Sequence, residues 1–474
     1  MGNIKDEVGW MEPKRGQLRR RGKVQEVLGL GGLVAAGLEI GVMFTMARSC
    51  ADKMLHKIQP VLLAVFTFLQ MHVLFLDSRR VISSLGCFRS IALMHLAAAN
   101  VAVWVRLMAW GTARSWLGTS HLTYNSSLAW PPPSFNHTVH SIDQSGRHRI
   151  HFTSNCRWTD YSDGKDSNDF LSYHLCLKNS TLGGIWDQAL PFLTPFVVQY
   201  SLGSAALLYT LWAGPVSRAL RQLDRRYSPS RSGTLERKSL QSQPLKPKSK
   251  LDCRGSTKGL FLGILVLVVG AIVMILFFVL RSNSRLQQDM LFIVKTLHCS
   301  VLGVSALAIL IGLLQVQQMC STSYDQLPPH RILQSYGIIS LMLFGAFTIV
   351  ASVNDVRNKP NLVTLVDAAL LIFQGCVQSL LVNRLAFKSC PSGCEHQKYR
   401  PGRQVVAFLI FTNFVLWILE TFTSQNHVAS QIQLDFFGKL PWDFITSLTL
   451  PIIMLYRIHS AVLFTEAWKH AYHT

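Results

Sequence analysis

The fold is decided by residues 259–280, which read GLFLGILVLVVGAIVMILFFVL. The stretch contains no charged side chain. A helix rises about 1.5 Å per residue, so a segment of this length crosses the hydrocarbon core of a bilayer, which is about 30 Å thick. The segment therefore predicts a transmembrane helix.

Similar apolar blocks recur along the 474 residues, 49% of which are hydrophobic, and charged residues lie between the blocks. Lipid cannot satisfy exposed backbone groups, and each block is about twice as long as a membrane-spanning strand requires, so helices are favoured over a barrel. The sequence predicts an all-α polytopic membrane protein with about ten transmembrane helices. The expected spans are 26–47, 58–77, 87–110, 187–212, 258–281, 290–316, 332–353, 362–386, 403–423 and 443–465.

The formal net charge is +21, and the basic residues gather on one side of the expected spans. The basic tail at 1–25 and the Ser/Pro-rich linker at 213–257 both fall inside if the N-terminus is cytosolic, as the positive-inside rule requires. We expect a multi-pass plasma-membrane protein with both termini in the cytosol. The linker is expected to be disordered and to contact anionic lipids, because it lacks the interleaved aromatic residues of a nucleic-acid-binding segment.

The loop at 113–186 falls outside in this orientation and carries three glycosylation sequons, at Asn125, Asn136 and Asn179. Cys156 and Cys176 share the loop, where an oxidising compartment permits a disulfide between them. The sequons support the orientation that the charges predict.

A weak duplication divides the spans into two halves, expected at 26–212 and 258–466, with a short cytosolic tail at 467–474. Each half contains a Gln, then an Asn followed four residues later by Trp, then a Pro followed five residues later by Tyr, on consecutive spans. This order predicts two parallel structural repeats. The polar side chains either hold each half together or form a constriction on a water path. They are Gln70, Asn100 and Tyr200 in the first half, and Gln378, Asn413 and Tyr456 in the second.

Two titratable residues within the spans are candidates for function. A carboxylate at Glu39 must face protein or water, and His459 changes charge near neutral pH, because imidazole titrates at a pH of about 6.5. Asp367, Lys295 and Glu420 also lie within spans without an obvious partner. The sequence contains no phosphate-binding loop, zincin motif or nucleophile elbow, so we expect neither an enzyme nor a bound metal or cofactor.

Three stretches resemble the otopetrin proton-channel family: DCRGSTKGLF at 252–261, KYRPGRQ at 398–404 and LPIIMLYRIHS at 450–460. The likeness covers residues 25–470. It implies a homodimer of subunits built from two six-helix halves, which passes protons into the cell when the outside is acidified. It also implies that Glu39, His459 and the two Gln, Asn and Tyr triads line the proton path.

This chain departs from the family pattern in several places. We expect the first two of the family's twelve helices to be absent. Gln199 stands where the family usually has a glutamate and cannot titrate, which makes the second half the favoured path. Within the second half, Ser447 and Thr423 stand where the family usually has a histidine and a carboxylate, and Glu420 lies one turn before Thr423. The expected function is a proton channel whose partners are protons and membrane lipids, with cholesterol and anionic lipids as candidates. The alternative is a non-conducting or regulatory subunit that dimerises with full-length relatives.

Overall fold

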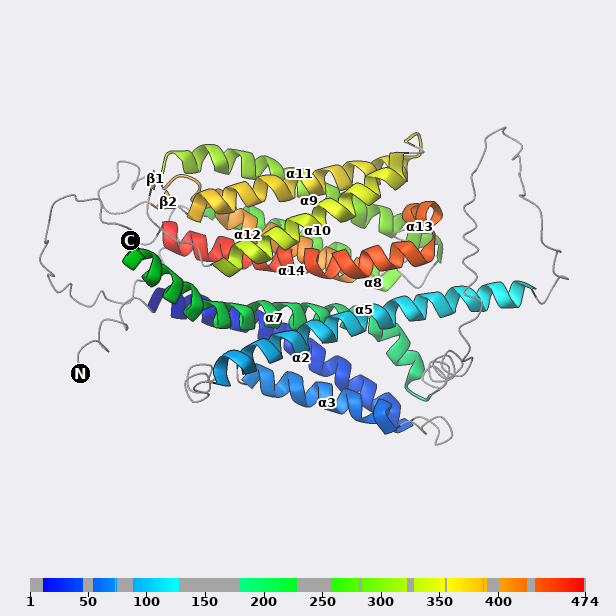
Figure 1. Cartoon of the computed structure of the whole chain (residues 1–474). Helices are drawn as coiled ribbons and strands as arrows, with labels where there is room; N and C mark the ends of the chain where they lie inside the picture. Colours follow the sequence, from blue (N-terminus) through cyan, green and yellow to red (C-terminus); the bar gives the residue numbers. More distant parts are fainter. Residues whose placement is uncertain are drawn as a thin grey trace, which may run out of the picture.

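A computed structural model shows a long bundle of helices (Figure 1). The expected sites at Asn136, Cys156, Cys176 and Asn179 lie outside the residues that the structure describes. The described residues are 12–45, 54–72, 74, 88–127, 180–227, 257–280, 284–321, 328–353, 356–386, 388–389, 400–423 and 431–472.

Four helices form a first group, which we call the N-half. α2 packs against both α3 and α7, and α5 packs against α7. Figure 1 shows the group on one side of the bundle. Its members are α2 (Glu12–Thr45), α3 (Met54–Met71), α5 (Arg89–Ser127) and α7 (Gly183–Tyr227).

The remaining helices form a second group, which we call the C-half. α12 packs against α8, α9 and α14, while α10 packs against α11 and α14. Two short antiparallel strands, β1 (Cys320–Ser321) and β2 (Lys388–Ser389), join the ends of α9 and α11. The helices are α8 (Thr257–Leu280), α9 (Ser284–Gln317), α10 (Pro328–Val353), α11 (Lys359–Ala386), α12 (Arg403–Thr423), α13 (Gln431–Phe437) and α14 (Lys439–Ala471).

The prediction of a polytopic α-helical membrane protein is confirmed. In the described part of the chain, nine helices are long and apolar enough to cross a membrane, and they coincide with nine of the ten expected spans. The expected span at 58–77 corresponds to the shorter apolar helix Ile58–Met71, because the helical residues that the structure describes end there.

Several helices extend beyond the expected spans, and α2, α5 and α7 extend the furthest. α2 begins at Glu12 within the expected N-terminal tail, α5 continues to Ser127 into the expected outer loop, and α7 continues to Tyr227 into the expected linker. Hydropathy cannot detect these extensions, because they are polar. Helix propensity explains two of them, since residues 14–23 and 218–226 are rich in arginine, lysine, leucine and glutamine.

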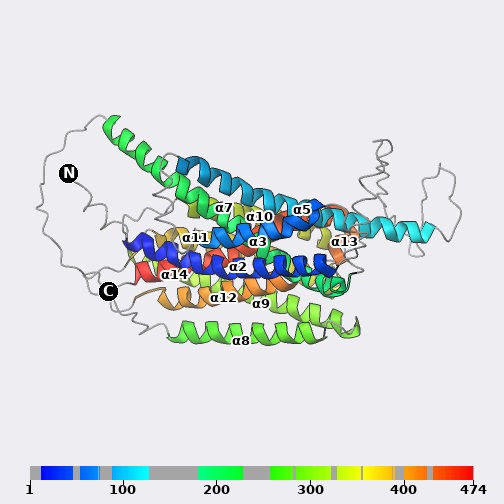
Figure 2. The ribbon, with the colours of Figure 1, turned by 90° about the horizontal axis from the view of Figure 1, so that it is seen from below.

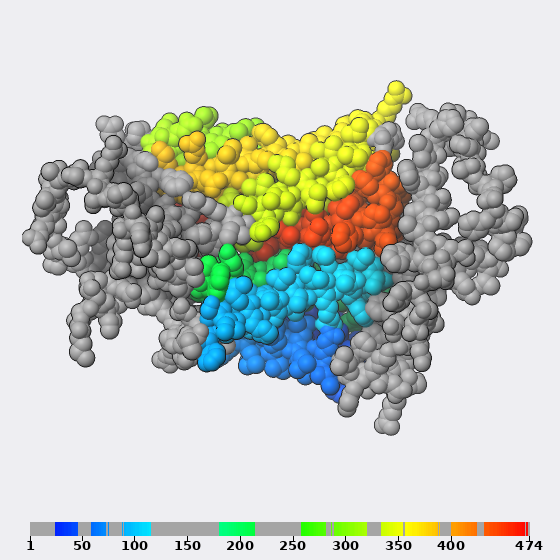
Figure 3. Space-filling model, in the orientation of Figure 1, coloured from blue at the N-terminus to red at the C-terminus, as the bar shows by residue number. Residues whose placement is uncertain are grey.

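α14 lies at the centre of the bundle. In its most apolar stretch 72% of the residues are buried, compared with 22% in α8, which lies at one edge of the bundle in Figure 2. α14 also packs against α5 and α7 of the N-half. Figure 3 shows α5 and α14 side by side along one face of the molecule. Side chains from both halves therefore meet on α14.

Successive helices run in opposite directions, so the bundle has two distinct ends. We call the end where α2 begins and α14 finishes the termini end, and the opposite one the far end (Figure 1). Equivalent helices of the two halves run the same way: α3 and α11, α5 and α12, and α7 and α14. This arrangement is the one that parallel repeats require.

Candidate functional site

A buried Gln–Asn pair joins α3 to α5 in the N-half. Gln70 Nε2 donates to Asn100 Oδ1 at 3.1 Å, and Asn100 Nδ2 donates to Gln70 Oε1 at 3.0 Å. Asn100 Nδ2 also donates to the carbonyl of Leu96, one turn earlier. The Tyr200 hydroxyl of α7 donates to the carbonyl of Thr67 at 3.3 Å. The three predicted residues therefore lie together and tie three helices.

The C-half repeats this arrangement on α11, α12 and α14. Gln378 and Asn413 exchange hydrogen bonds of 3.0 and 2.9 Å, and Asn413 Nδ2 donates to the carbonyl of Leu409. The Tyr456 hydroxyl lies 3.3 Å from Gln378 Nε2 and from the carbonyl of Gly375. In each half the tyrosine reaches the carbonyl three residues before the glutamine, so the two clusters are structural equivalents.

Gln199 departs from this equivalence because it faces the other half. Its side chain is fully buried, its Oε1 accepts a 2.7 Å hydrogen bond from Trp417 Nε1 of α12, and its Nε2 lies 3.4 Å from Met454 Sδ of α14. The matching position in the C-half is Leu455, which has no polar atom to offer. Gln199 thus connects α7 to two helices of the C-half.

A buried ionic network extends from the C-half cluster toward the far end. Arg457 is fully buried, and its Nε and Nη1 donate to Glu420 at 3.0 Å and to Gln374 at 2.7 Å. His298 Nδ1 lies 2.7 Å from an Asp367 oxygen, and His298 Nε2 lies 3.5 Å from a Glu420 oxygen.

The network continues at both ends. Lys295 Nζ is 2.9 Å from the second oxygen of Asp367. At the other end Gln374 Nε2 donates to Gln378, the glutamine of the C-half cluster, at 2.8 Å. Charged and polar groups therefore link α9, α11, α12 and α14 within the C-half.

The sequence places most of these charged residues within spans but does not indicate their partners. Lys295 and His298 are three residues apart on α9, so they share one helix face, and both contact Asp367. An intramembrane charge is costly unless it has a partner, and these spans contain two carboxylates together with a lysine, an arginine and a histidine. That balance could have predicted the network, although it could not have assigned the partners.

Glu39 lines a cavity of about 380 Å³ at the far end, between the N-half and α14. It is half-buried on α2 and interacts electrostatically with Arg106 of α5. Arg114 also lines the cavity, where it forms a 2.8 Å ion pair with Asp187. Other lining residues are Trp104, Trp186, Val198, Lys439, Trp442, Asp443, Ser447 and Met454.

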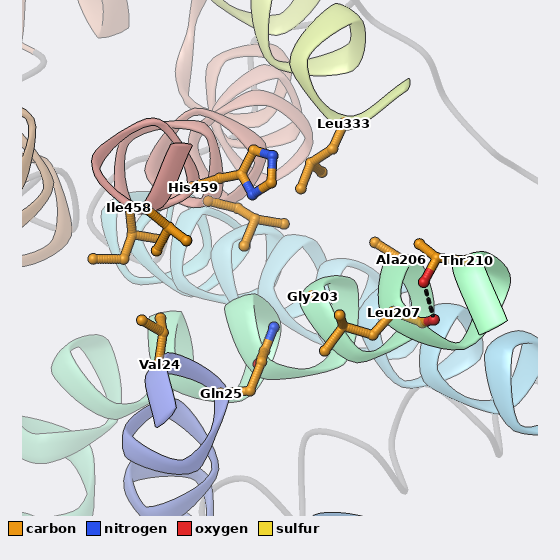
Figure 4. A pocket seen from close by; sticks show the side chains of 11 residues that line it. Val24, Gln25, Gly203, Ala206, Leu207, Thr210, Leu333, Ile458 and His459 are labelled. Carbon is orange, nitrogen blue, oxygen red and sulfur yellow. Dashed lines mark hydrogen bonds between the residues drawn. The ribbon is translucent and has the colours of Figure 1, made fainter. Parts of the chain in front are cut away.

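His459 lines a smaller cavity of about 50 Å³ at the termini end. Figure 4 shows His459 on one side of this cavity and Val24 and Gln25 of α2 on the other. Gly203 and Leu455 contribute the α7 and α14 walls. A cavity of this size has room for ordered water if polar groups face it.

The two cavities lie along one interface, between α7 and α14, which we call the seam. Val198 and Met454 line the far-end cavity, whereas Gly203 and Leu455 line the termini-end cavity. Gln199 lies between these residues on α7 and contacts Met454. The two candidate titratable residues therefore occupy opposite ends of the seam, and Gln199 closes its middle.

Replacing Gln378 by leucine should lower stability without opening a cavity, because the two side chains have similar volumes. The change removes both hydrogen bonds that Gln378 exchanges with Asn413 and leaves the buried Asn413 Oδ1 without its donor, which costs about 1–3 kcal/mol. Thermal unfolding of the detergent-solubilised protein measures the loss. Leu380→Met is a control, because Leu380 is exposed on the same helix and the change keeps the side chain apolar; an equal loss in both variants would contradict the assignment.

No group of three or more His, Cys, Asp or Glu side chains in the described residues is arranged to hold a metal ion. What the described residues do contain is a two-half helical bundle with buried polar clusters and a hydrogen-bonded seam between two cavities. The fold and the site thus define a polytopic membrane protein with polar groups aligned along the membrane direction, the class to which channels and transporters belong.

Comparison with known proteins gives the family. A model described as Otopetrin matches residues 20–458, and the chain belongs to the otopetrin family. The match confirms the resemblance seen in the sequence. Over 453 residues the chain is 27% identical to "Proton channel OtopLc" of Drosophila melanogaster, an alignment that covers 94% of this chain. The chain spans about a quarter of that protein, 27% of its length.

Two mammalian relatives are covered more completely. The chain is 23% identical to "Proton channel OTOP2" of Mus musculus and covers 81% of its length. It is also 23% identical to "Proton channel OTOP2" of Homo sapiens, of which it covers 76%. The insect relative and both mammalian relatives are thus named as proton channels.

Proposed function

We propose that this chain is a proton-selective channel that passes protons into the cell when the outside is acidified. The family and the names of its relatives support a passive proton pathway. The observation that carries the proposal is the position of Glu39 and His459 in two cavities at opposite ends of the seam. The role assigned to the chain is transport rather than catalysis.

We infer that the route follows the seam rather than the interior of the C-half. Arg457 is fully buried in the C-half, and a guanidinium does not give up its proton in proteins. A guanidinium also has no acceptor atom, so Arg457, whose Nε and Nη1 donate to Glu420 and Gln374, cannot relay a proton through the C-half. The clusters around Gln70 and Gln378 then act mainly as hydrogen-bonded supports for the helices that border the seam.

The proposed orientation follows from the charges in the sequence. With the termini end in the cytosol, the far-end cavity with Glu39 is open to the acidic side and His459 is near the cytosol. The assignment places the sequons Asn125, Asn136 and Asn179 outside the cell, with the cysteines Cys156 and Cys176. We propose a homodimer in the plasma membrane, with anionic lipids at the basic cytosolic segments and cholesterol as a further lipid candidate.

Whole-cell recording from cells that express this chain alone tests the proposal. Acidifying the bath should evoke an inward current and lower the cytosolic pH, and the reversal potential should follow the proton gradient. Glu39→Gln should reduce this current about tenfold if the carboxylate supplies about 1.4 kcal/mol of stabilisation to the passing proton. Surface biotinylation controls for the amount of protein at the membrane. Normal surface expression without acid-evoked current would refute the channel assignment.

A further inference from the structure

Gln25 of α2 has an unusual position at the termini-end cavity. It is 6% exposed, and its side chain rises from α2 toward the cavity on the side opposite His459 (Figure 4). Its Oε1 atom is buried and has no hydrogen-bond partner among the residues that the structure describes. A buried amide oxygen without a partner costs free energy, so its presence beside a cavity indicates a role other than packing.

Gly203 of α7 determines where this amide lies. A Cβ atom at position 203 would overlap Gln25 Nε2 and lie 2.7 Å from Gln25 Cδ, and the three nearest atoms all belong to Gln25. Gly203 is in a regular helix, so its missing side chain provides space rather than a special backbone conformation. The Gln25 amide thus occupies the place that a side chain on α7 would fill.

The chemistry of a carboxamide suits a position beside the imidazole. The amide offers both a donor and an acceptor, but it does not titrate, so it orients water without trapping a proton. Thr210 of α7 lines the same cavity, but its hydroxyl donates to the carbonyl of Leu207 at 2.7 Å. Gln25 therefore supplies the polar atoms on the α2 side.

We propose that Gln25, held in place by the space at Gly203, is the positioning residue at the cytosolic end of the seam. It orients the water through which a proton moves between His459 and the termini end. This inference rests on the proposed channel function. It adds a second residue of α2, after Glu39, to a route that runs between α7 and α14.

The first test replaces the amide by a side chain of similar length. Gln25→Met keeps the volume and removes both polar atoms, so the acid-evoked current per surface molecule should fall about tenfold, as it should in Gln25→Ala. The ratio of currents in H₂O and D₂O should rise in both variants, because proton transfer at this point becomes rate-limiting. A packing role predicts instead that methionine restores the current that alanine loses.

The second test uses the contact between the two residues. Gly203→Ala should lower the current to a similar extent, because the new Cβ displaces the amide. In a Gln25→Ala background the same Gly203→Ala change should have almost no further effect, since Gln25 supplies the nearest atoms. Gly184→Ala on the same helix is the matched control, because a Cβ there meets nothing within 4 Å.

The outcomes separate this inference from the channel assignment. If the unmodified chain conducts and Gln25→Met conducts equally well or better, the positioning role is wrong and the channel assignment remains. Additive effects of Gln25→Ala and Gly203→Ala would likewise overturn the role. A silent unmodified chain at the cell surface would overturn both.

Discussion

Replacing Arg457 by methionine should cause the largest loss of stability among the substitutions proposed for this protein. The guanidinium is fully buried and donates to Glu420 and Gln374, so its removal leaves a buried carboxylate without its strongest partner. Breaking a buried ion pair from one side costs about 3–5 kcal/mol. We expect a sharply lower unfolding temperature and a loss of the monodisperse peak in size-exclusion chromatography of the solubilised protein.

Two further variants show whether the uncompensated charge is the cause. Adding Glu420→Gln to Arg457→Met removes the orphaned carboxylate and should recover part of the stability. Arg114→Met makes the same substitution in an ion pair whose side chains are 21% and 37% exposed, where the loss should stay below about 1 kcal/mol. Equal losses in Arg114→Met and Arg457→Met would show that burial of the network does not matter.

Replacing Gln199 by glutamate should increase the acid-evoked proton current. Gln199 lies between the two cavities of the seam and cannot titrate, so a proton on the proposed route passes it without a titratable group. A carboxylate of the same size still accepts the hydrogen bond from Trp417 and adds a site for the proton. If that site lowers the barrier by about 1.4 kcal/mol, the current rises about tenfold.

Gln199→Met is the matched variant for this prediction. It has a similar length but neither accepts from Trp417 nor binds a proton, so its current should be no higher than that of the unmodified chain. Currents are compared per surface molecule at the same bath pH. If glutamate and methionine change the current equally, Gln199 is not on the route, and the path lies elsewhere in the bundle.

The sequence was sufficient to predict the membrane fold, because each span is encoded locally. A run such as 259–280 has apolar side chains that are unfavourable in water and the length of a bilayer core, so nine spans could be predicted without tertiary information, and the expected span at 58–77 corresponds to the shorter helix Ile58–Met71. The ends of α2, α5 and α7 could not be predicted from apolar runs. Beyond the apolar core, backbone hydrogen bonds and helix propensity extend the helix, and hydropathy does not detect either of them.

The polar triads were also visible in the sequence, since the duplication repeats the order of Gln70, Asn100 and Tyr200 in the second half. What the sequence did not contain was the pairing across helices. Gln199 contacts Trp417 and Met454, which lie more than 200 positions away in the sequence. These contacts, like those of Arg457, depend on how each helix is rotated about its axis.

Glu39 and His459 show most clearly what the sequence predicts and what depends on helix packing. Their residue types, in the middle of apolar spans, marked them as functional candidates, because an ionisable group in lipid must be compensated. Only the packing of α2, α7 and α14 gave each of them a cavity, put both cavities on one seam and brought Gln25 and Gly203 together at its end. Local chemistry thus marked the candidate residues, and the tertiary structure decided which of them meet, because contacts between helices depend on side-chain shape and helix rotation.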